Sequence, residues 1–229
     1  GISGIGMAAH LARQCPGRSY AVVERRERLG GTWDLFRYPG VRSDSDMFTL
    51  GYAFEPWRNA KAIATGATIR DYLEKVARDH GVMEHIHFGQ TLVAADWDSS
   101  RGTWTVQLED GSGNRSALSC RFLFMGSGYY DYDQPHAADI PGIGAFTGKV
   151  LHPQFWPEDE DLSGKRVVVI GSGATAATLV PALAQSGAQV TMLQRTPTYY
   201  IIRPSADGLA NLLRRVLPER WAYALTRFK

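Results

Sequence analysis

The sequence predicts an α/β protein built from two Rossmann-like dinucleotide-binding modules. Two glycine-rich turns support this prediction, one at the start of the chain and one at Gly171. Each turn is followed by a segment with helical periodicity and then by a short apolar run, which is the order of elements in a βαβ unit. We expect the first module to span residues 1–139, a linker to span 140–164 and the second module to span 165–229.

The composition is that of an ordinary globular protein. Of the 229 residues, 44% are hydrophobic and 21% are charged, and the net charge of +2 gives no reason to expect a nucleic-acid partner. No apolar run approaches the roughly 20 residues that a membrane helix needs. Cys15 and Cys120 have neither CxxC nor metal-binding spacing. We therefore expect reduced thiols, no metal site and a cytoplasmic location.

The first glycine-rich turn can be read in two registers. Gly4-Ile5-Gly6-Met7-Ala8-Ala9 fits the pattern G-x-G-x-x-A, whereas in the alternative register Gly1 and Gly4 are the second and third motif glycines. Glu24 ends the next apolar run and lies 20 residues after Gly4 but only 15 after Ala9. Only the longer spacing leaves room for a helix, a turn and a strand. We therefore take Gly1 and Gly4 as the motif glycines.

The residues of this turn predict a site for FAD or NAD. Gly1 lets the backbone approach a pyrophosphate, and a helix predicted over residues 5–14 directs its N-terminal amides at that charge. Ser3 is placed to contact the phosphates. The Glu24 carboxylate accepts hydrogen bonds from ribose hydroxyls and repels a 2′-phosphate, which disfavours NADP at this site.

The second turn lies in a complete βαβ pattern and predicts an NADP site. A β-branched strand over 166–170 leads into the turn, a helix runs to Leu183, and a second strand covers 189–193. No acid follows this strand. Arg195 can instead pair with a 2′-phosphate and Thr196 can donate a hydroxyl to it; the alternative for Arg195 is an exposed cation at a strand end. The residues expected to cradle the pyrophosphate are Gly171, Ser172, Gly173, Ala174, Thr175 and Ala176.

Segments outside the two turns predict structure rather than chemistry. Thr68 is expected to cap an amphipathic helix that ends at Gly81, and four β-type runs follow, over 85–88, 92–97, 103–108 and 118–125. His85 and His87 alternate along one of these runs and are not expected to bind a metal. A helix near the end of the sequence has an apolar face, for which we favour packing over a role at a membrane surface. Its residues are Leu209, Leu212, Leu213, Val216 and Leu217.

Two further segments resemble those of a known enzyme family. The linker fits F-x-G-x-x-x-H-x-x-x-W-P at Phe146, Gly148, His152, Trp156 and Pro157. This pattern resembles the fingerprint of the Baeyer–Villiger monooxygenases. Residues 30–44 resemble the flavin-facing segment of the same enzymes, and residues 45–52 are similar to the branch that activates ethionamide. The resemblance implies a two-dinucleotide-binding flavoprotein, here a part of a longer chain that is truncated at both ends.

The resemblance also implies roles for individual residues. Thr32 and Trp33 would line FAD, and Arg42, Ser43 and Asp44 would contact the cofactors. Asp44 would sit beside the flavin ring as the partner of a catalytic arginine beyond residue 229, although a turn carboxylate is the alternative. Backbone atoms near Leu92 would contact the adenine of FAD, and the small residues 126–128 resemble the second flavin motif. His152 would take part in catalysis by fixing the linker, a structural role that suits it better than that of a general base.

The implied reaction is an oxygenation. NADPH reduces FAD, and the reduced flavin takes up O2 as a C4a-peroxyflavin, which attacks a ketone or the sulfur of a thioamide or sulfide. One alternative is a flavin-containing N- or S-oxygenase, whose loop resembles the fingerprint without Trp156-Pro157. Another, of a different class, is a non-catalytic nucleotide-binding module. A disulfide reductase would need a redox cysteine pair, which Cys15 and Cys120 do not form. We expect the 229 residues alone to be inactive.

Overall fold

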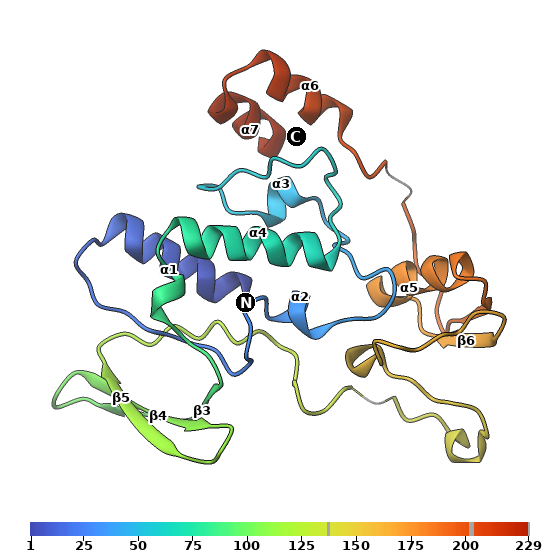
Figure 1. The fold of residues 1–229 in the computed structure, drawn as a ribbon, viewed down its shortest axis with the longest axis horizontal. Coiled ribbons are helices and arrows are strands. Elements are labelled where there is room, and N and C mark those ends of the chain that lie inside the picture. The colour runs from blue at the N-terminus through green and yellow to red at the C-terminus, as the bar shows by residue number, and fades with distance from the viewer. Residues whose placement is uncertain (137, 202–203, 229) are drawn as a thin grey trace. The chain divides into compact units, whose positions relative to one another are not determined.

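The computed structural model describes residues 1–136, 138–201 and 204–228. The chain is a mixed α/β protein, as predicted (Figure 1). It divides into two compact units. Unit 1 contains Gly1–Leu35 and Ile69–Asp131, and unit 2 contains Phe36–Thr68 and Tyr132–Lys229. The predicted boundaries at 139/140 and 164/165 stay predictions, and residues 137, 202, 203 and 229 of the predicted modules lie outside the described ranges.

In unit 1, three helices and a short parallel strand pair belong to the first module. Helix α1 (Ile2–Gln14) precedes β1 (Val22–Val23), which pairs in parallel with β2 (Ile86–His87). Helix α2 (Thr32–Leu35) and helix α4 (Gly66–Asp79) complete it, with a 3-10 turn at Met83–His85. The core consists of small and branched side chains that are buried: Ile5, Ala8, Ala9, Ile69, Leu73, Val76, Ala77 and Val82.

Helix α4 has the predicted buried face but a different start. The helix begins at Gly66, and the hydroxyl of Thr65 accepts a hydrogen bond from the backbone N–H of Thr68 at 3.3 Å. The prediction that Thr68 is the cap was therefore wrong, because the hydroxyl that caps the first turn comes three residues earlier.

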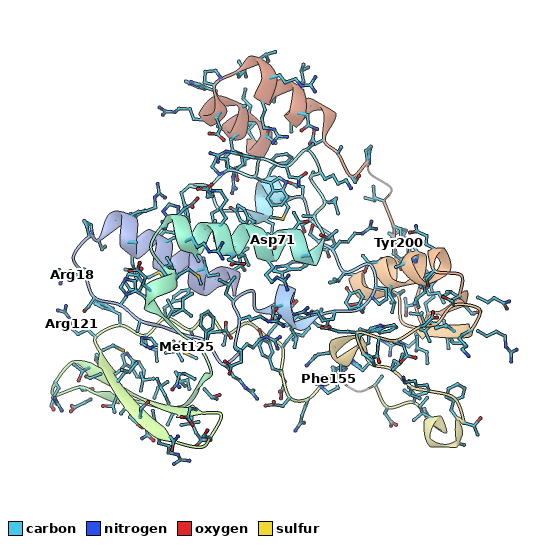
Figure 2. All side chains as sticks on the ribbon, in the orientation of Figure 1. Arg18, Asp71, Arg121, Met125, Phe155 and Tyr200 are labelled. Atoms are coloured by element: carbon cyan, nitrogen blue, oxygen red, sulfur yellow. The ribbon has the colours of Figure 1, made fainter. Side chains whose placement is uncertain are left out.

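A three-stranded antiparallel meander follows, made of β3 (Gln90–Asp98), β4 (Thr103–Asp110) and β5 (Arg115–Cys120). Its last strand ends earlier than predicted, since residues 121–127 form no strand. A strand needs a neighbour for its backbone hydrogen bonds, and none of the described residues pairs with this segment. Its side chains Phe122, Phe124 and Met125 are exposed (Met125 is labelled in Figure 2).

In unit 2, the second predicted module forms as a βαβ unit. Strand β6 (Arg166–Ile170) pairs in parallel with β7 (Gln189–Leu193), and helix α5 (Ala174–Gln185) connects them. Ala176, Leu179 and Leu183 of α5 are buried. Each strand matches its predicted span, because a β-branched run, a glycine turn and a closing glycine are all local signals.

The other regular elements of unit 2 are short helices joined by loops. Helix α3 (Met47–Leu50) packs against α7 (Glu219–Phe228), which follows α6 (Gly208–Val216), and 3-10 turns occur at Ile143–Ala145 and Pro153–Phe155. None of the helices in the described ranges has the length and apolar character needed to cross a bilayer. In the predicted packing face of α6, Leu209, Leu212 and Val216 are 50%, 55% and 65% exposed, so none of the described residues covers them. The predicted helical spacing of the apolar residues was correct, but this spacing does not determine which part of the protein covers them.

Candidate functional site

The first glycine-rich turn lies at the N-terminus of α1. Gly1 is the N-cap residue, and its carbonyl accepts a hydrogen bond from the N–H of Ile5 at 3.1 Å. Ser3 and Gly4 therefore belong to the first turn of the helix. The register that starts at Gly4 would need a turn before the helix begins. Gly4-Ile5-Gly6 instead lies inside the helix. This geometry favours Gly1 and Gly4 as motif glycines.

Glu24 lies at the same helix end. It follows β1 directly, and its side chain is 14% exposed. One carboxylate oxygen accepts a hydrogen bond from the backbone N–H of Arg26 at 3.1 Å, and the other lies 3.3 Å from the backbone nitrogen of Gly1. The structure thus places an acidic acceptor beside the helix amides that would face a pyrophosphate.

Three stretches of backbone come close together at this point. A Cβ atom at Gly1 would lie 3.6 Å from Cα of Gly31, and a Cβ atom at Gly126 would lie 3.2 Å from the nitrogen of Gly4. Gly30 has φ +129°, which L residues rarely adopt. Glycine is therefore favoured at Gly30 by its backbone conformation and at Gly126 by the close approach to Gly4, whereas the 3.6 Å distance at Gly1 is an ordinary contact.

The sequence reasoning missed a buried carboxylate next to Thr32 and Trp33. Asp34 is 1% exposed, and its carboxylate lies 2.6 Å from a guanidinium nitrogen of Arg26 and 3.4 Å from one of Arg70. Arg28 lies 3.6 Å away. The sequence did contain a signal for this cluster, namely a lone acid in a short apolar segment with several arginines nearby in the sequence. The cluster fixes α2, and with it the half-buried Thr32 and Trp33, in unit 1.

The second glycine-rich turn leaves open space in front of α5. Gly171 has φ +124°, and a Cβ atom at Gly171 or Gly173 would have no atom within 4 Å. Gly173 is the N-cap residue of α5 and contributes no side-chain hydrogen bond. The amides of the first helical turn, at Ala174, Thr175 and Ala176, are therefore not capped by a side chain and suit an anion.

The chain after β7 folds back onto this turn. The hydroxyls of Ser172 and Thr198 are 2.7 Å apart, and the Tyr200 hydroxyl donates to the Ser172 carbonyl at 2.9 Å (Tyr200 is labelled in Figure 2). Arg195 and Thr196, at the start of this returning segment, are exposed. Within the part of the chain that the structure describes, the Arg195 guanidinium has no ion-pair partner. Thr198 and Tyr200 were not predicted, because no local pattern indicates the return.

The segment after Trp33 is anchored on α5. The hydroxyl of Thr178 donates to that of Tyr38 at 3.4 Å. Gly40 has φ +82°, and a Cβ atom there would lie 2.6 Å from the Thr178 carbonyl oxygen and 2.8 Å from Cβ of Ala182. Glycine is therefore required at this point by both its conformation and the contact with the helix.

The predicted cofactor-binding residues at 42–44 alternate in exposure. Ser43 is buried; its N–H donates to the Ala64 carbonyl at 2.8 Å, and its hydroxyl accepts from the Ala64 N–H at 3.2 Å. Arg42 and Asp44 on either side are exposed, and Asp44 accepts a hydrogen bond from the Ser45 hydroxyl at 3.3 Å. Ser43 thus anchors the loop while Arg42 and Asp44 face outward.

The fingerprint residues organise the linker locally. The ring of Phe146 covers Gly148, where a Cβ atom would lie 2.5 Å from the ring. His152 caps the turn Pro153–Phe155 by accepting a hydrogen bond at Nδ1 from the N–H of Gln154 at 3.2 Å. Gln154 is buried, and Trp156 is partly buried. His152 therefore has a structural contact of the kind expected for a residue that fixes a loop.

The structure gives few contacts for the remaining predicted site residues. Leu92 is partly buried in β3, where the pairing with β4 shifts between Leu92 and Ala94. No cluster of potential metal ligands occurs among the described residues. At the entry to β6, a hydrogen bond from the Ser163 hydroxyl lowers the pKa of Asp161, which keeps this loop carboxylate ionised.

Comparisons with known proteins agree with this geometry. A family of NAD(P)-binding Rossmann-like domains matches residues 1–63, and the family described as flavin-binding monooxygenase-like matches residues 60–227. The FAD-containing monooxygenase EthA of Mycobacterium tuberculosis is 53% identical over the whole chain, which spans 47% of that relative. The chain thus covers about half the length of the curated relatives that it matches.

Two solved structures have the same fold. A steroid monooxygenase bound to NADP matches 98% of the chain with a TM-score of 0.77 and 28% identity, and the chain covers 42% of it. OTEMO in complex with FAD and NADP matches 86% of the chain with a TM-score of 0.71 and 30% identity, and the chain covers 38% of it. The predicted resemblance to this enzyme family is therefore confirmed, and the chain belongs to the flavin-binding monooxygenase-like family.

Proposed function

We propose that this chain is the nucleotide-binding part of an FAD- and NADPH-dependent monooxygenase that inserts one oxygen atom of O2 next to a ketone carbonyl. The observation that carries the proposal is the contrast between two corresponding positions. Glu24 follows the strand after the first glycine turn, and Arg195 lies two residues beyond the strand after the second. An acid at this position suits a free ribose, and an arginine suits a 2′-phosphate. The first site is accordingly assigned to FAD and the second to NADPH.

The residues of the first site fit FAD. The helix end at Gly1 provides amides for the pyrophosphate, Ser3 lies in the same helical turn, and Glu24 provides an acceptor for the ribose. The close approach of the backbone at Gly31 and Gly126 leaves this helix end bordered by small residues. Thr32 and Trp33 are held next to it by the Asp34 cluster.

The residues of the second site fit NADPH. The open face above Gly171 and Gly173 accommodates a pyrophosphate in front of α5. The exposed guanidinium of Arg195 is available for a 2′-phosphate, and the exposed Thr196 hydroxyl follows it. The contact between Ser172 and Thr198 holds this returning segment beside the turn.

The chain's own contribution to the reaction is binding and orientation. Bound FAD, once reduced by NADPH, supplies the activation of O2. Tyr38 and Gly40 lie against α5, so the segment that by resemblance faces the flavin is fixed to the helix whose start faces NADP. Asp44 extends outward from this segment, where it can hold an arginine from elsewhere in the protein. His152 keeps the linker in one conformation through its bond to Gln154.

Two substrate classes fit this chemistry. Trp156-Pro157 favours Baeyer–Villiger oxidation of a ketone, because the N- and S-oxygenase loop resembles the rest of the fingerprint without this pair. The resemblance of residues 45–52 to the branch that activates ethionamide keeps a thioamide or sulfide as a second substrate class for the same enzyme.

Replacing Glu24 with alanine in the full-length protein is expected to weaken FAD retention. The variant loses the ribose acceptor at the first site, so apo-protein should accumulate during purification. The ratio of flavin to protein absorbance measures this. The choice between NADPH and NADH should not change. Full flavin content combined with weaker NADPH binding would show that the two sites have been exchanged.

The full-length protein is expected to convert a methyl ketone into an ester with NADPH and air. Replacing His152 with alanine should lower ester formation at least about tenfold, the effect of losing roughly 1.4 kcal/mol of positioning, and should raise peroxide release. The flavin should stay bound, since His152 lies outside both glycine turns. Gas chromatography and a peroxide assay measure both outcomes. Sulfoxide from a thioether with no ester from any ketone would instead identify an N- or S-oxygenase.

A further inference from the structure

The last two helices of unit 2 expose large apolar side chains. On α6, Leu209, Leu212 and Val216 recur at helical spacing and are 50%, 55% and 65% exposed. On α7, Trp221, Leu225 and Phe228 recur in the same way and are 63%, 49% and 93% exposed. Isolated exposed hydrophobic residues are common, but stripes along two consecutive helices indicate a binding surface. We call these six residues the apolar face.

The opposite, polar side of α6 is the side bound to the protein. Asn211 donates a hydrogen bond to the Ala60 carbonyl at 3.2 Å, and Arg214 donates to the Asn59 carbonyl at 3.2 Å and to that of Trp57 at 3.4 Å. These bonds fix the rotation of α6 about its axis. The leucines therefore face away from the unit because the polar residues are anchored to it.

Helix α7 is fixed in a similar way. Its buried side consists of Ala222, Tyr223 and Thr226. The Tyr223 hydroxyl donates to the carbonyl of Phe48 at 3.1 Å, and Arg227 donates to the same carbonyl at 2.7 Å. Trp221, Leu225 and Phe228 are left on the outside.

Arginines border the apolar face. A groove of about 440 Å³ next to α6 is lined by Arg58, Ala60, Asn211, Arg214, Arg215 and Glu219. Arg58 hydrogen-bonds Glu219 at 2.5 Å and lowers the pKa of that carboxyl group, so the single acid of the groove is neutralised. Arg215 and Arg220 are exposed and have no ion-pair partner among the described residues. The groove therefore carries a net positive charge.

We propose that α6 and α7 dock on the surface of an anionic phospholipid membrane. The apolar face enters the boundary between headgroups and acyl chains, and Arg215 and Arg220 contact lipid phosphates. Exposed Leu, Val, Trp and Phe side chains next to arginines are the composition of helices that lie in a membrane interface. With 9 and 10 residues, the two helices are too short to span the bilayer and lie along it.

Charge argues against a second copy of the chain as the occupant. In a two-fold dimer, the same surface of both copies would meet. Arg215 and Arg220 of both copies would then be brought into one interface, whereas an anionic membrane offers them partners of opposite charge. The membrane is therefore the occupant that satisfies the apolar residues and the arginines together.

Vesicle flotation with the full-length, flavin-loaded protein tests this proposal. The protein should float with vesicles of phosphatidylcholine and phosphatidylglycerol, and binding should weaken without phosphatidylglycerol or at high salt. The double substitution Leu212→Gln and Val216→Gln should reduce vesicle binding by more than about tenfold. Arg215→Gln should reduce it about fivefold, the equivalent of ~1 kcal/mol for one basic residue near the membrane.

Matched variants separate this surface from general effects. Leu118→Gln removes a 40% exposed leucine from β5 and Arg101→Gln removes an exposed arginine from the β3–β4 turn, and both should float like the parent protein. The Leu212 and Val216 variant should keep its flavin content and melting temperature.

Three results would overturn the proposal. The first is that the parent protein does not float with the vesicles, or that the substituted variants float as well as the parent does. The second is a dimer seen by analytical ultracentrifugation without vesicles and lost in the Leu212 and Val216 variant, which identifies a second copy as the occupant. The third is a large drop in the melting temperature of that variant, which shows that another segment of the full-length protein covers the face.

Discussion

Replacing Asp34 with alanine is expected to lower the free energy of unfolding by about 3–5 kcal/mol, the cost of removing one partner from a buried charge cluster. The carboxylate is 1% exposed and lies within 3.6 Å of guanidinium nitrogens of Arg26, Arg28 and Arg70. Without it, the partly buried Arg26 and Arg70 lose their counter-charge. Urea denaturation of the full-length protein measures the change. Flavin content should fall as well, because α2 carries Thr32 and Trp33.

Asp96→Ala is the matched control, since Asp96 is exposed on β3. Its effect should stay within about 0.5 kcal/mol, the usual range for a surface position. An Asp34 variant as stable as this control, with full flavin, would show that the cluster neither stabilises α2 nor positions the residues assigned to FAD.

The second large effect is expected for Gly40→Ala, with a loss of about 2–4 kcal/mol. Alanine at φ +82° costs roughly 1 kcal/mol. The new Cβ atom would also lie 2.6 Å from the Thr178 carbonyl oxygen, so the segment must move away from α5, and overpacking of this kind costs about 1–3 kcal/mol. Because the segment leads to Asp44, we also expect slower flavin reduction by NADPH.

Gly113→Ala measures the cost of the backbone conformation alone, so the difference between the two variants gives the steric part. Gly113 has φ +81°, nearly the same as Gly40, but a Cβ atom there would meet nothing within 4 Å. Thermal unfolding of both variants should therefore show a clearly larger loss for Gly40→Ala. Equal losses would mean that only the backbone conformation matters and that the contact with α5 is not tight.

The parts of the fold that the sequence predicted well rest on local patterns. The βαβ unit over 166–193 was correct because a β-branched run, a glycine turn and Gly187 follow one another directly. The buried face of α4 was correct because its apolar residues recur with the helical period. Glu24 directly after β1 was also predictable, since spacing along the chain determined it.

The parts that failed depend on partners distant in the sequence. The apolar run over 121–125 forms no strand, because strand formation needs a neighbouring backbone and none pairs with it in the described ranges. The Asp34 cluster includes Arg70, 36 positions away, so the local sequence shows the acid and its near arginines but not this distant partner. The apolar face of α6 was correct as a pattern, but it does not pack against the described residues, because Asn211 and Arg214 determine which side of the helix meets them.

The central claim is that Glu24 selects FAD at the first site and Arg195 selects NADPH at the second. The most direct test measures flavin reduction by rapid mixing with NADPH and with NADH, in the full-length protein and in its Arg195→Ala variant. The variant should need about ten- to a hundredfold more NADPH for the same rate, since a hydrogen bond to a charged group contributes roughly 1.5–3 kcal/mol. Its response to NADH should not change. An equal loss with both nucleotides, or a NADPH-specific loss in the Glu24→Ala variant instead, would contradict the assignment.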